Sequence, residues 1–379
     1  MENEEDNVRT WSNDSYRYPR RSATRRYLIS AVVGIVIVYL LLFVKLPFFI
    51  FMPGTAEEIK PMVTIAKGSD IEKGTLMLTT VRVADANMVN YLIGLVHPYE
   101  EIQPKTSVLK KGESEQEYSQ RQEYVMLTSQ ASAIQAAYTH AKIPFHISHE
   151  GVMVLQTLPG LSGEKVLKPG DILLKVGDKE VKVAQDLLDS LKGKKAGESI
   201  PITFMRNKAE QQATLALGAL PLQAGEKEAR AGIGVVPADM QSVKADQADQ
   251  QVTIKAGEIG GPSAGLMFSL EIYNQLVPED ITKGYRIAGT GTIETDGTVG
   301  PIGGIQHKII AADREKAEYF FAPKDMTYKD GTQISNYSDA VHRAEQIKTK
   351  MKIIEIGSMD DALKFLAALP PKEVEKSKK

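Results

Sequence analysis

Two glycine-rich turns carry the side chains best suited to chemistry. Residues 260–265 read Gly-Gly-Pro-Ser-Ala-Gly and precede an apolar helical run over 266–276, which puts Ser263 at a helix start. Backbone N–H groups at a helix start have no partner in the helix, so they can hold an anion beside the serine hydroxyl. The pattern suits a serine nucleophile with an oxyanion held by the backbone of Gly261, Pro262 and Ser263. Serine is also a common helix cap, and this motif alone leaves that alternative open.

The second turn supplies an amine. Residues 289–308 read Gly-Thr-Gly-Thr-Ile-Glu-Thr-Asp-Gly-Thr-Val-Gly-Pro-Ile-Gly-Gly-Ile-Gln-His-Lys and lead through a strand and a hairpin into a helical run over 309–317. Lys308 therefore falls in a first helical turn, where the helix dipole lowers its pKa. With an ordinary pKa of about 10.4, only about one lysine in 2,500 is neutral at pH 7. Burial must lower that pKa by roughly three units, at a cost of about 4 kcal/mol, for Lys308 to act as a base.

Together the two motifs, with Lys308 placed 45 residues after Ser263, resemble the proteolytic domain of Lon proteases over residues 229–370. The resemblance implies that Ser263 is the nucleophile and Lys308 its general base. ATP-dependent Lon enzymes usually have an aspartate three residues before the serine, where this chain has Gly260, so loop control and self-inhibition stay open. Thr290 lies in the second motif and is a candidate to orient the lysine, but it is not among the predicted catalytic residues. His307 points about 100° away from Lys308 on a helix, so we expect it to be a surface or supporting residue.

Residues 126–218 resemble a bacterial PDZ domain. Residues 167–181 read Leu-Lys-Pro-Gly-Asp-Ile-Leu-Leu-Lys-Val-Gly-Asp-Lys-Glu-Val, which predicts a turn, a buried strand, a hairpin turn and a second strand. PDZ domains accept an extended peptide as an added strand. The resemblance implies a receiving strand that starts at Gly151 and includes Val152, Met153 and Val154. A small β module that only spaces the peptidase from the membrane is the alternative.

The N-terminal region contains a candidate membrane anchor. Residues 27–44 carry no charge, and the apolar character resumes after Pro47 as far as residue 52, so we predict an anchor over 27–52. Arginines crowd its N-terminal side only, which predicts that residues 1–26 are a cytoplasmic tail and that everything after the anchor is extracytoplasmic. A buried core helix is the alternative for this run. Residues 55–125 predict a β-containing layer followed by a helical connector, whose helix runs from about 112 to 141.

Composition excludes several kinds of site. The net charge is -2 and no basic stripe is present, so the sequence gives no reason to expect nucleic-acid binding. Without cysteine, and without two histidines at metal-ligand spacing, it predicts no metal site and no cofactor. A phosphate-binding loop of the form G-x-x-x-x-G-K-[ST] is also absent, so we expect no use of ATP.

These observations predict an α+β multidomain protein with a single N-terminal transmembrane helix, a PDZ-like β module, a C-terminal Lon-type α/β proteolytic domain and a polar tail over 371–379. The order resembles that of membrane-anchored Lon-like serine proteases of Gram-positive bacteria. The predicted function is an ATP-independent, membrane-anchored serine endopeptidase that cleaves extracytoplasmic polypeptides through a Ser-Lys dyad. A catalytically silent, membrane-tethered PDZ scaffold that binds peptides is the alternative. Assembly into a homo-oligomer is implied by the family alone.

Overall fold

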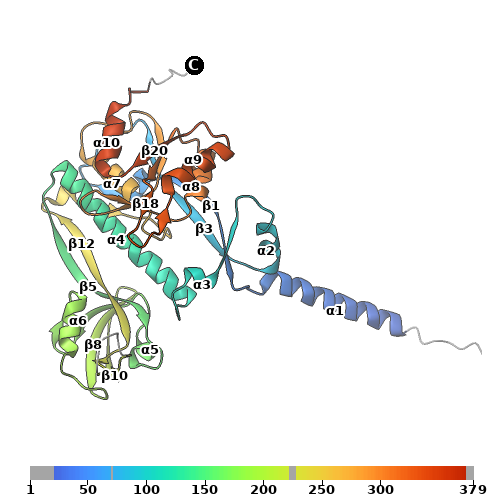
Figure 1. Ribbon diagram of the computed structural model, residues 1–379. Helices are drawn as coiled ribbons and strands as arrows, with labels where there is room; N and C mark the ends of the chain where they lie inside the picture. Colours follow the sequence, from blue (N-terminus) through green and yellow to red (C-terminus); the bar gives the residue numbers. More distant parts are fainter. Residues whose placement is uncertain (1–20, 70, 222–227, 373–379) are drawn as a thin grey trace, which may run out of the picture.

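The computed structural model describes residues 21–69, 71–221 and 228–372 (Figure 1). The predicted tails, 1–26 and 371–379, lie mostly outside this part of the chain. The described residues form a mixed α/β structure with a long N-terminal helix, a three-layered lobe and a smaller β module. The fold class expected from the sequence is confirmed.

Helix α1 (Arg21–Phe43) projects from the rest of the molecule (Figure 1). Its Arg25–Phe43 stretch is long and apolar enough to cross a membrane and is entirely unburied. The prediction that the anchor extends to residue 52 was wrong, because β1 (Phe48–Glu58) starts after Pro47 and pairs on both sides. Proline lacks the N–H that a continuing helix needs, and Ile50 is fully buried in the sheet.

A six-stranded sheet forms the centre of the larger lobe, which we call the catalytic lobe. The spatial order is β20 (Lys352–Ile356), β17 (Tyr319–Pro323), β14 (Arg286–Gly289), β3 (Thr75–Asp85), β1 and β4 (Glu101–Pro104). The first four of these strands run parallel, and β1 pairs antiparallel with β3 on one side and with β4 on the other. Strands from the first third of the chain are thus built into the same sheet as strands from its last third, rather than forming a layer of their own.

Both faces of this sheet are covered by helices. Side chains alternate along each strand, so Leu76 and Leu78 join one core while Met77 joins the other. The first face packs against α4 (Glu115–Ala141), α7 (Gly265–Leu276) and α10 (Met359–Ala368), and the second against α8 (Ile305–Arg314) and α9 (Asn336–Gln346). Ser263, just before α7, and Lys308, in α8, are therefore positioned from opposite faces of the sheet.

Helix α4 confirms the helix expected over 112–141. A capping box between Ser114 and Glu117 starts it, and Lys142 ends it in a left-handed conformation. It runs unbroken through residue 126 and packs on α7, with Ala133, Ala136 and neighbouring residues buried in the shared core. The predicted connector is therefore part of the catalytic lobe.

The smaller module has its own hydrophobic core, which includes Val152, Leu173, Ile202 and Leu215. Its sheet order is β12 (Val235–Ala245), β5 (Phe145–Thr157), β6 (Ile172–Val176), β8 (Ser199–Arg206) and β9 (Ala209–Ala216), with β7 (Lys179–Glu180) beside β6 and helices α5 (Ser162–Val166) and α6 (Ala184–Leu191). The module differs from the expected range 126–218 at both ends, since α4 belongs to the catalytic lobe and β12 adds residues 235–245. The ribbon of β5 and β12 reaches from the module to the catalytic lobe (Figure 1), where Val243 is buried.

Short elements complete the described chain. The helices are α2 (Met88–Gly94) and α3 (Lys105–Val108), with 3-10 turns at Lys60–Met62 and Ala248–Gln250. Four two-stranded pairs are β2 (Val63–Ile65) with β13 (Val252–Ile254), β10 (Gly218–Ala219) with β11 (Ala231–Gly232), β15 (Thr292–Ile293) with β16 (Val299–Gly300), and β18 (Met326–Thr327) with β19 (Gln333–Ile334).

Candidate active site

Ser263 lies in a tight turn immediately before α7, which begins at Gly265. The Ser263 carbonyl accepts hydrogen bonds from the Thr290 hydroxyl at 2.9 Å and the Gly291 N–H at 2.8 Å, and both donors follow β14. Glycine is required at 265, because an added Cβ would come within 2.6 Å of the Ser129 hydroxyl. The backbone around Ser263 is therefore fixed by groups on two sides.

Lys308 lies in the first turn of α8, as its position after the glycine pair predicts. Its Nζ is 3.0 Å from Ser263 Oγ and donates to the Thr79 carbonyl at 2.6 Å. Helix α7 and helix α8 cover opposite faces of the sheet, and the two side chains meet beyond the carboxyl end of β14, where β3 continues past its neighbour. Crevices at the carboxyl ends of parallel strands are the usual sites of α/β sheets.

The environment of Lys308 favours its neutral form. The side chain is 2% exposed, and burial lowers its pKa to about 7. Relative to an ordinary value of about 10.5, this is a preference of roughly 5 kcal/mol for the uncharged amine. A substantial fraction of the lysine is then unprotonated near pH 7 and can accept the proton of the adjacent hydroxyl.

Three residues at this site were missed by the sequence analysis. Thr79 of β3 accepts the hydrogen bond from Lys308, whereas Gln122 and Ser129 of α4 brace the nucleophile turn. The Gln122 carbonyl accepts from Gly261 N–H at 2.9 Å, and the Ser129 hydroxyl donates to the Pro262 carbonyl at 2.8 Å. No motif surrounds these residues, and they stand far from Ser263 in the chain, so local patterns carry no signal for them.

The predicted oxyanion-binding backbone needs correction. The Gly261 N–H is already used by Gln122, and Pro262 has no N–H to give. Within the described ranges, the Ser263 N–H donates to no acceptor. Of the three predicted residues, Ser263 alone retains a free backbone donor beside its own hydroxyl.

Two neighbours of the dyad also differ from expectation. Thr290 contacts the Ser263 carbonyl rather than the lysine amine. His307 is 3% exposed, so of its two predicted roles the surface position was wrong, while a supporting role stays a prediction. It faces Glu101 of β4, with Nε2 3.7 Å from a carboxylate oxygen. Burial lowers the pKa of His307, which keeps the imidazole neutral near pH 7.

The predicted peptide-receiving strand is occupied. Gly151, Val152, Met153 and Val154 lie in β5, which pairs with β12 on one side and with β6 on the other. Both sets of backbone groups are used, so no further strand can be added there. The sheet instead ends at β12 and β9, and at β12 the carbonyl of Asp239 accepts a hydrogen bond from Tyr124 of α4.

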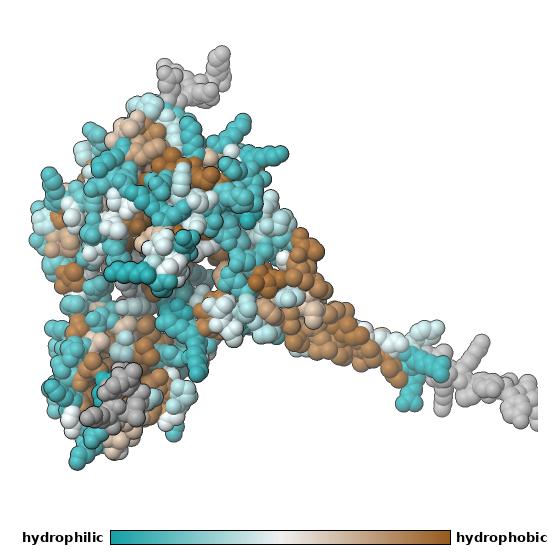
Figure 2. All heavy atoms as spheres, in the orientation of Figure 1, coloured by the Kyte–Doolittle hydropathy of each residue, from teal (hydrophilic) through white to brown (hydrophobic). Residues whose placement is uncertain are grey.

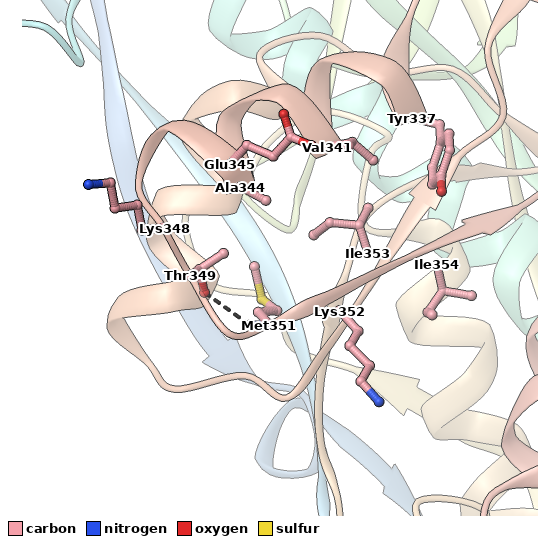
Figure 3. Close-up of a pocket in the computed structure, with 10 residues that line it drawn as sticks. All are labelled: Tyr337, Val341, Ala344, Glu345, Lys348, Thr349, Met351, Lys352, Ile353 and Ile354. Carbon is pink, nitrogen blue, oxygen red and sulfur yellow. Dashed lines mark hydrogen bonds between the residues drawn. The ribbon is translucent and has the colours of Figure 1, made fainter.

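A surface hollow lies away from the dyad. Its volume is about 580 Å³, and it is lined by α9 and the edge strand β20, with Tyr337, Met351 and Ile353 among its residues (Figure 3). Neither Ser263 nor Lys308 lines it. The hollow is therefore separate from the Ser263–Lys308 contact.

Comparisons with known families agree with both motifs. Residues 197–368 match the Lon protease (S16) C-terminal proteolytic domain, and residues 143–217 match the PDZ domain. The predicted resemblances to a Lon proteolytic domain and to a PDZ domain are thereby confirmed. The chain contains a Lon-type proteolytic domain and a PDZ-like module.

Individual relatives cover only part of the chain. The Lon protease of Campylobacter concisus is 34% identical over 27% of this chain and 12% of its own length, and that of Azospirillum brasilense 33% identical over 27% and 11%. The Lon protease of Endomicrobium trichonymphae is 28% identical over 36% and 17%. The chain thus spans less than a fifth of the length of these relatives. The crystal structure of the PDZ domain of an SdrC-like protein from Listeria monocytogenes is 24% identical, with 24% of this chain and 90% of that chain covered and a TM-score of 0.21.

Proposed function

We propose that this protein is a membrane-anchored serine endopeptidase that cleaves extracytoplasmic polypeptides through a Ser263–Lys308 dyad without ATP. One observation carries the proposal: a buried amine with a pKa of about 7 lies 3.0 Å from a serine hydroxyl at the start of a helix. A lysine kept only for structure has no reason to be buried without a carboxylate partner. A lysine base for serine needs this environment.

The proposed reaction follows from the contacts. Neutral Lys308 accepts the Ser263 proton while Oγ attacks the peptide carbonyl, and the Ser263 N–H donates to the oxygen that becomes negative. The Thr79 carbonyl holds the amine in place and stabilises the ammonium that forms. That ammonium returns the proton to the leaving amine. In the second half, Lys308 takes a proton from water as that water attacks the acyl-enzyme carbonyl. The ammonium then returns this proton to the departing Ser263 oxygen, which restores the hydroxyl and the neutral amine.

Anchoring and orientation rest on α1. The helix is apolar and unburied over Arg25–Phe43, and the arginines on its N-terminal side stay in the cytoplasm by the positive-inside rule. The catalytic lobe then lies outside the cytoplasm. Since the sequence has no phosphate-binding loop, substrates must be flexible segments rather than stable domains that require forced unfolding.

We assign the PDZ-like module a role in docking polypeptide substrates, on the edge strand β12 rather than on β5, which is paired on both sides. Docking on the module would tether a substrate and raise the effective concentration of its scissile bond at Ser263. A catalytically silent peptide-binding scaffold would use the same edge, but its Ser263–Lys308 pair would catalyse no cleavage.

The test uses the full chain in lipid nanodiscs with an unstructured polypeptide such as casein. We expect cleavage by the native protein and by Ser190→Ala, a matched hydroxyl deletion in α6, and none by Ser263→Ala. Adding ATP and magnesium should leave the rate unchanged. Equal cleavage by Ser263→Ala would contradict the assignment, whereas peptide binding without any cleavage would favour the scaffold.

A further inference from the structure

An apolar surface lies where the catalytic lobe meets the C-terminal end of α1. It consists of α2 and the turn after it, and residues 86–99 contain no Asp, Glu, Lys or Arg. Large apolar side chains stand open to solvent there: Met88 39%, Leu92 56%, Ile93 49%, Leu95 61% and Val96 82%. Figure 2 shows the hydrophobic surface of α1 continuing onto this part of the molecule. We call these five residues the α2 patch.

The α2 patch is held rigidly against the lobe. Tyr91 packs on Phe48 of β1 with ring centroids 5.2 Å apart, and Gly94 approaches Ile102 of β4 so closely that an added Cβ would lie 3.2 Å from it. One side of α2 is therefore packed on the sheet, and the patch is what remains outside. A capping box between Asn87 and Asn90 fixes the helix start.

The same cap ties α2 to the last turn of α1. Asn87 Nδ2 donates to the Leu42 carbonyl at 2.8 Å, and the Leu46 N–H donates to the Ala86 carbonyl at 2.7 Å. Whatever surrounds the C-terminal end of α1 must therefore also meet α2. The charged neighbours on either side, Lys45 and Asp85, pair with each other at 2.5 Å, so they oppose an apolar environment less than separate charges would.

We propose that the α2 patch inserts into the lipid surface around the end of α1 and serves as a second membrane contact. This inference rests on the proposed anchoring by α1. Exposed apolar side chains at the depth where a membrane helix ends gain by entering the boundary between headgroups and acyl chains, typically by about 5–10 Å. Tyrosines such as Tyr91 and Tyr99 are favoured at that depth.

A second contact fixes the height of the active site. β3 runs without interruption from Thr79, which holds Lys308, to Asp85, directly before the α2 cap. Six extended residues span roughly 20 Å. The length of β3 then keeps the dyad within roughly 20 Å of the lipid. At that height the dyad can reach the part of a membrane-anchored polypeptide that lies just outside the bilayer. The favoured substrate class is therefore such juxtamembrane segments.

Tryptophan quenching tests the insertion. The chain has one tryptophan, Trp11, so Trp11→Phe gives a background into which single probes are placed. Val96→Trp reports on the α2 patch, with Leu92→Trp as a second probe should the first fail to fold. Val36→Trp in α1 reports on the anchor. Leu188→Trp, at an exposed apolar position of α6, is the control.

The full chain is reconstituted in two sets of phosphatidylcholine vesicles, one with bromine on the acyl chains near the headgroups and one with bromine near the bilayer centre. We expect at least twofold quenching at position 96 by the shallow bromine, at least twofold quenching at position 36 by the deep bromine, and none at 188 by either. Quenching at 36 without quenching at 96 overturns the second contact and leaves the anchor standing. A blue-shifted but unquenched probe at 96 means that protein covers the patch, which also overturns the lipid assignment. Absence of quenching at 36 contradicts the anchor, and the inference falls with it.

Discussion

Two buried ionisable groups lie at or beside helix α7, in different surroundings. Beside the N-terminal end of α7, burial lowers the pKa of Lys308 of α8 to about 7 next to the Ser263 hydroxyl. In the second half of α7, burial raises the pKa of Glu271 to about 8, with the nearby Glu72 adding to the shift. Gln275 donates to one Glu271 oxygen at 2.6 Å, and the other oxygen has no partner in the described residues.

A perturbed pKa therefore does not by itself identify a catalytic group. Near pH 7, Glu271 is mostly neutral and Lys308 is about half neutral, because burial disfavours the charged form of both side chains. Only Lys308 faces a nucleophile and a fixed acceptor, whereas Glu271 faces Glu72, Lys60 and Asp280 at the side away from the dyad. Geometry therefore distinguishes Lys308, the proposed base, from Glu271.

The largest expected difference between Lys308 and Glu271 is in activity. Lys308→Arg keeps the positive charge but cannot lose it near neutral pH, so it should reduce kcat/KM by between about 10³- and 10⁶-fold. Glu271→Gln should stay within about threefold of the native rate. Steady-state kinetics on a short fluorogenic peptide would measure both. Comparable losses in the two variants would erase the distinction.

Stability should respond to pH in opposite ways. The pKa of Glu271 is raised in the folded protein, so between about pH 4.5 and 8 the unfolded state binds fewer protons than the folded state. The free energy of unfolding therefore falls as the pH rises across this range. Glu271→Gln removes this loss, and its advantage over the native protein should grow across that window, by roughly 5 kcal/mol at most. Melting temperatures measured at pH 5 and pH 8.5 would show it, with exposed Glu210→Gln as control.

Lys308→Met gives the mirror image. Because the folded-state pKa is lowered to about 7, the unfolded chain holds the extra proton between about 7 and 10.5, and native stability rises with pH across that range. The advantage of Lys308→Met should therefore be largest below pH 7 and shrink as pH 10.5 is approached. An advantage that does not change with pH would argue that the amine is not buried as described.

The smallest effect concerns Ser129, a positioning residue. Removing its hydroxyl leaves the Pro262 carbonyl without that donor, worth about 1 kcal/mol, so Ser129→Ala should lower kcat about fivefold with KM nearly unchanged. The pH midpoint of kcat should not move, because Lys308 is untouched. Ser190→Ala provides the matched control. A shifted midpoint would mean that Ser129 acts on the lysine rather than on the nucleophile turn.

Sequence patterns predicted what is local and missed what is assembled across the chain. Ser263 and Lys308 stand in glycine-bounded helix starts, which can be read within a few residues. Thr79 is 229 residues from Lys308, and Ser129 is 133 from Pro262; nothing near either residue marks its role. Apolarity likewise could not separate the end of α1 from β1, since residues 48–52 are as free of charge as the helix; Pro47 and the strand partners of β1 distinguish the two.

The module shows the same limit. The sequence predicted its strands, but not that residues 235–245 return to pair with β5 and close the edge assigned to Gly151. Strand pairing over such separations depends on the cores at both ends of the ribbon, where Val154 and Val243 are buried. A register of this kind is set by tertiary packing rather than by local propensity.

The dyad itself is tested most directly by the pH dependence of Ser263 acylation. The second-order rate of labelling by a serine-reactive fluorophosphonate would be measured from pH 5 to 10, on the native protein and on Lys308→Arg. If buried Lys308 is the base, labelling of the native protein rises with pH through a midpoint near 7 and levels off above it, while Lys308→Arg labels at least about 10³-fold more slowly. A midpoint near 10, or equal labelling of the two proteins, would contradict the assignment.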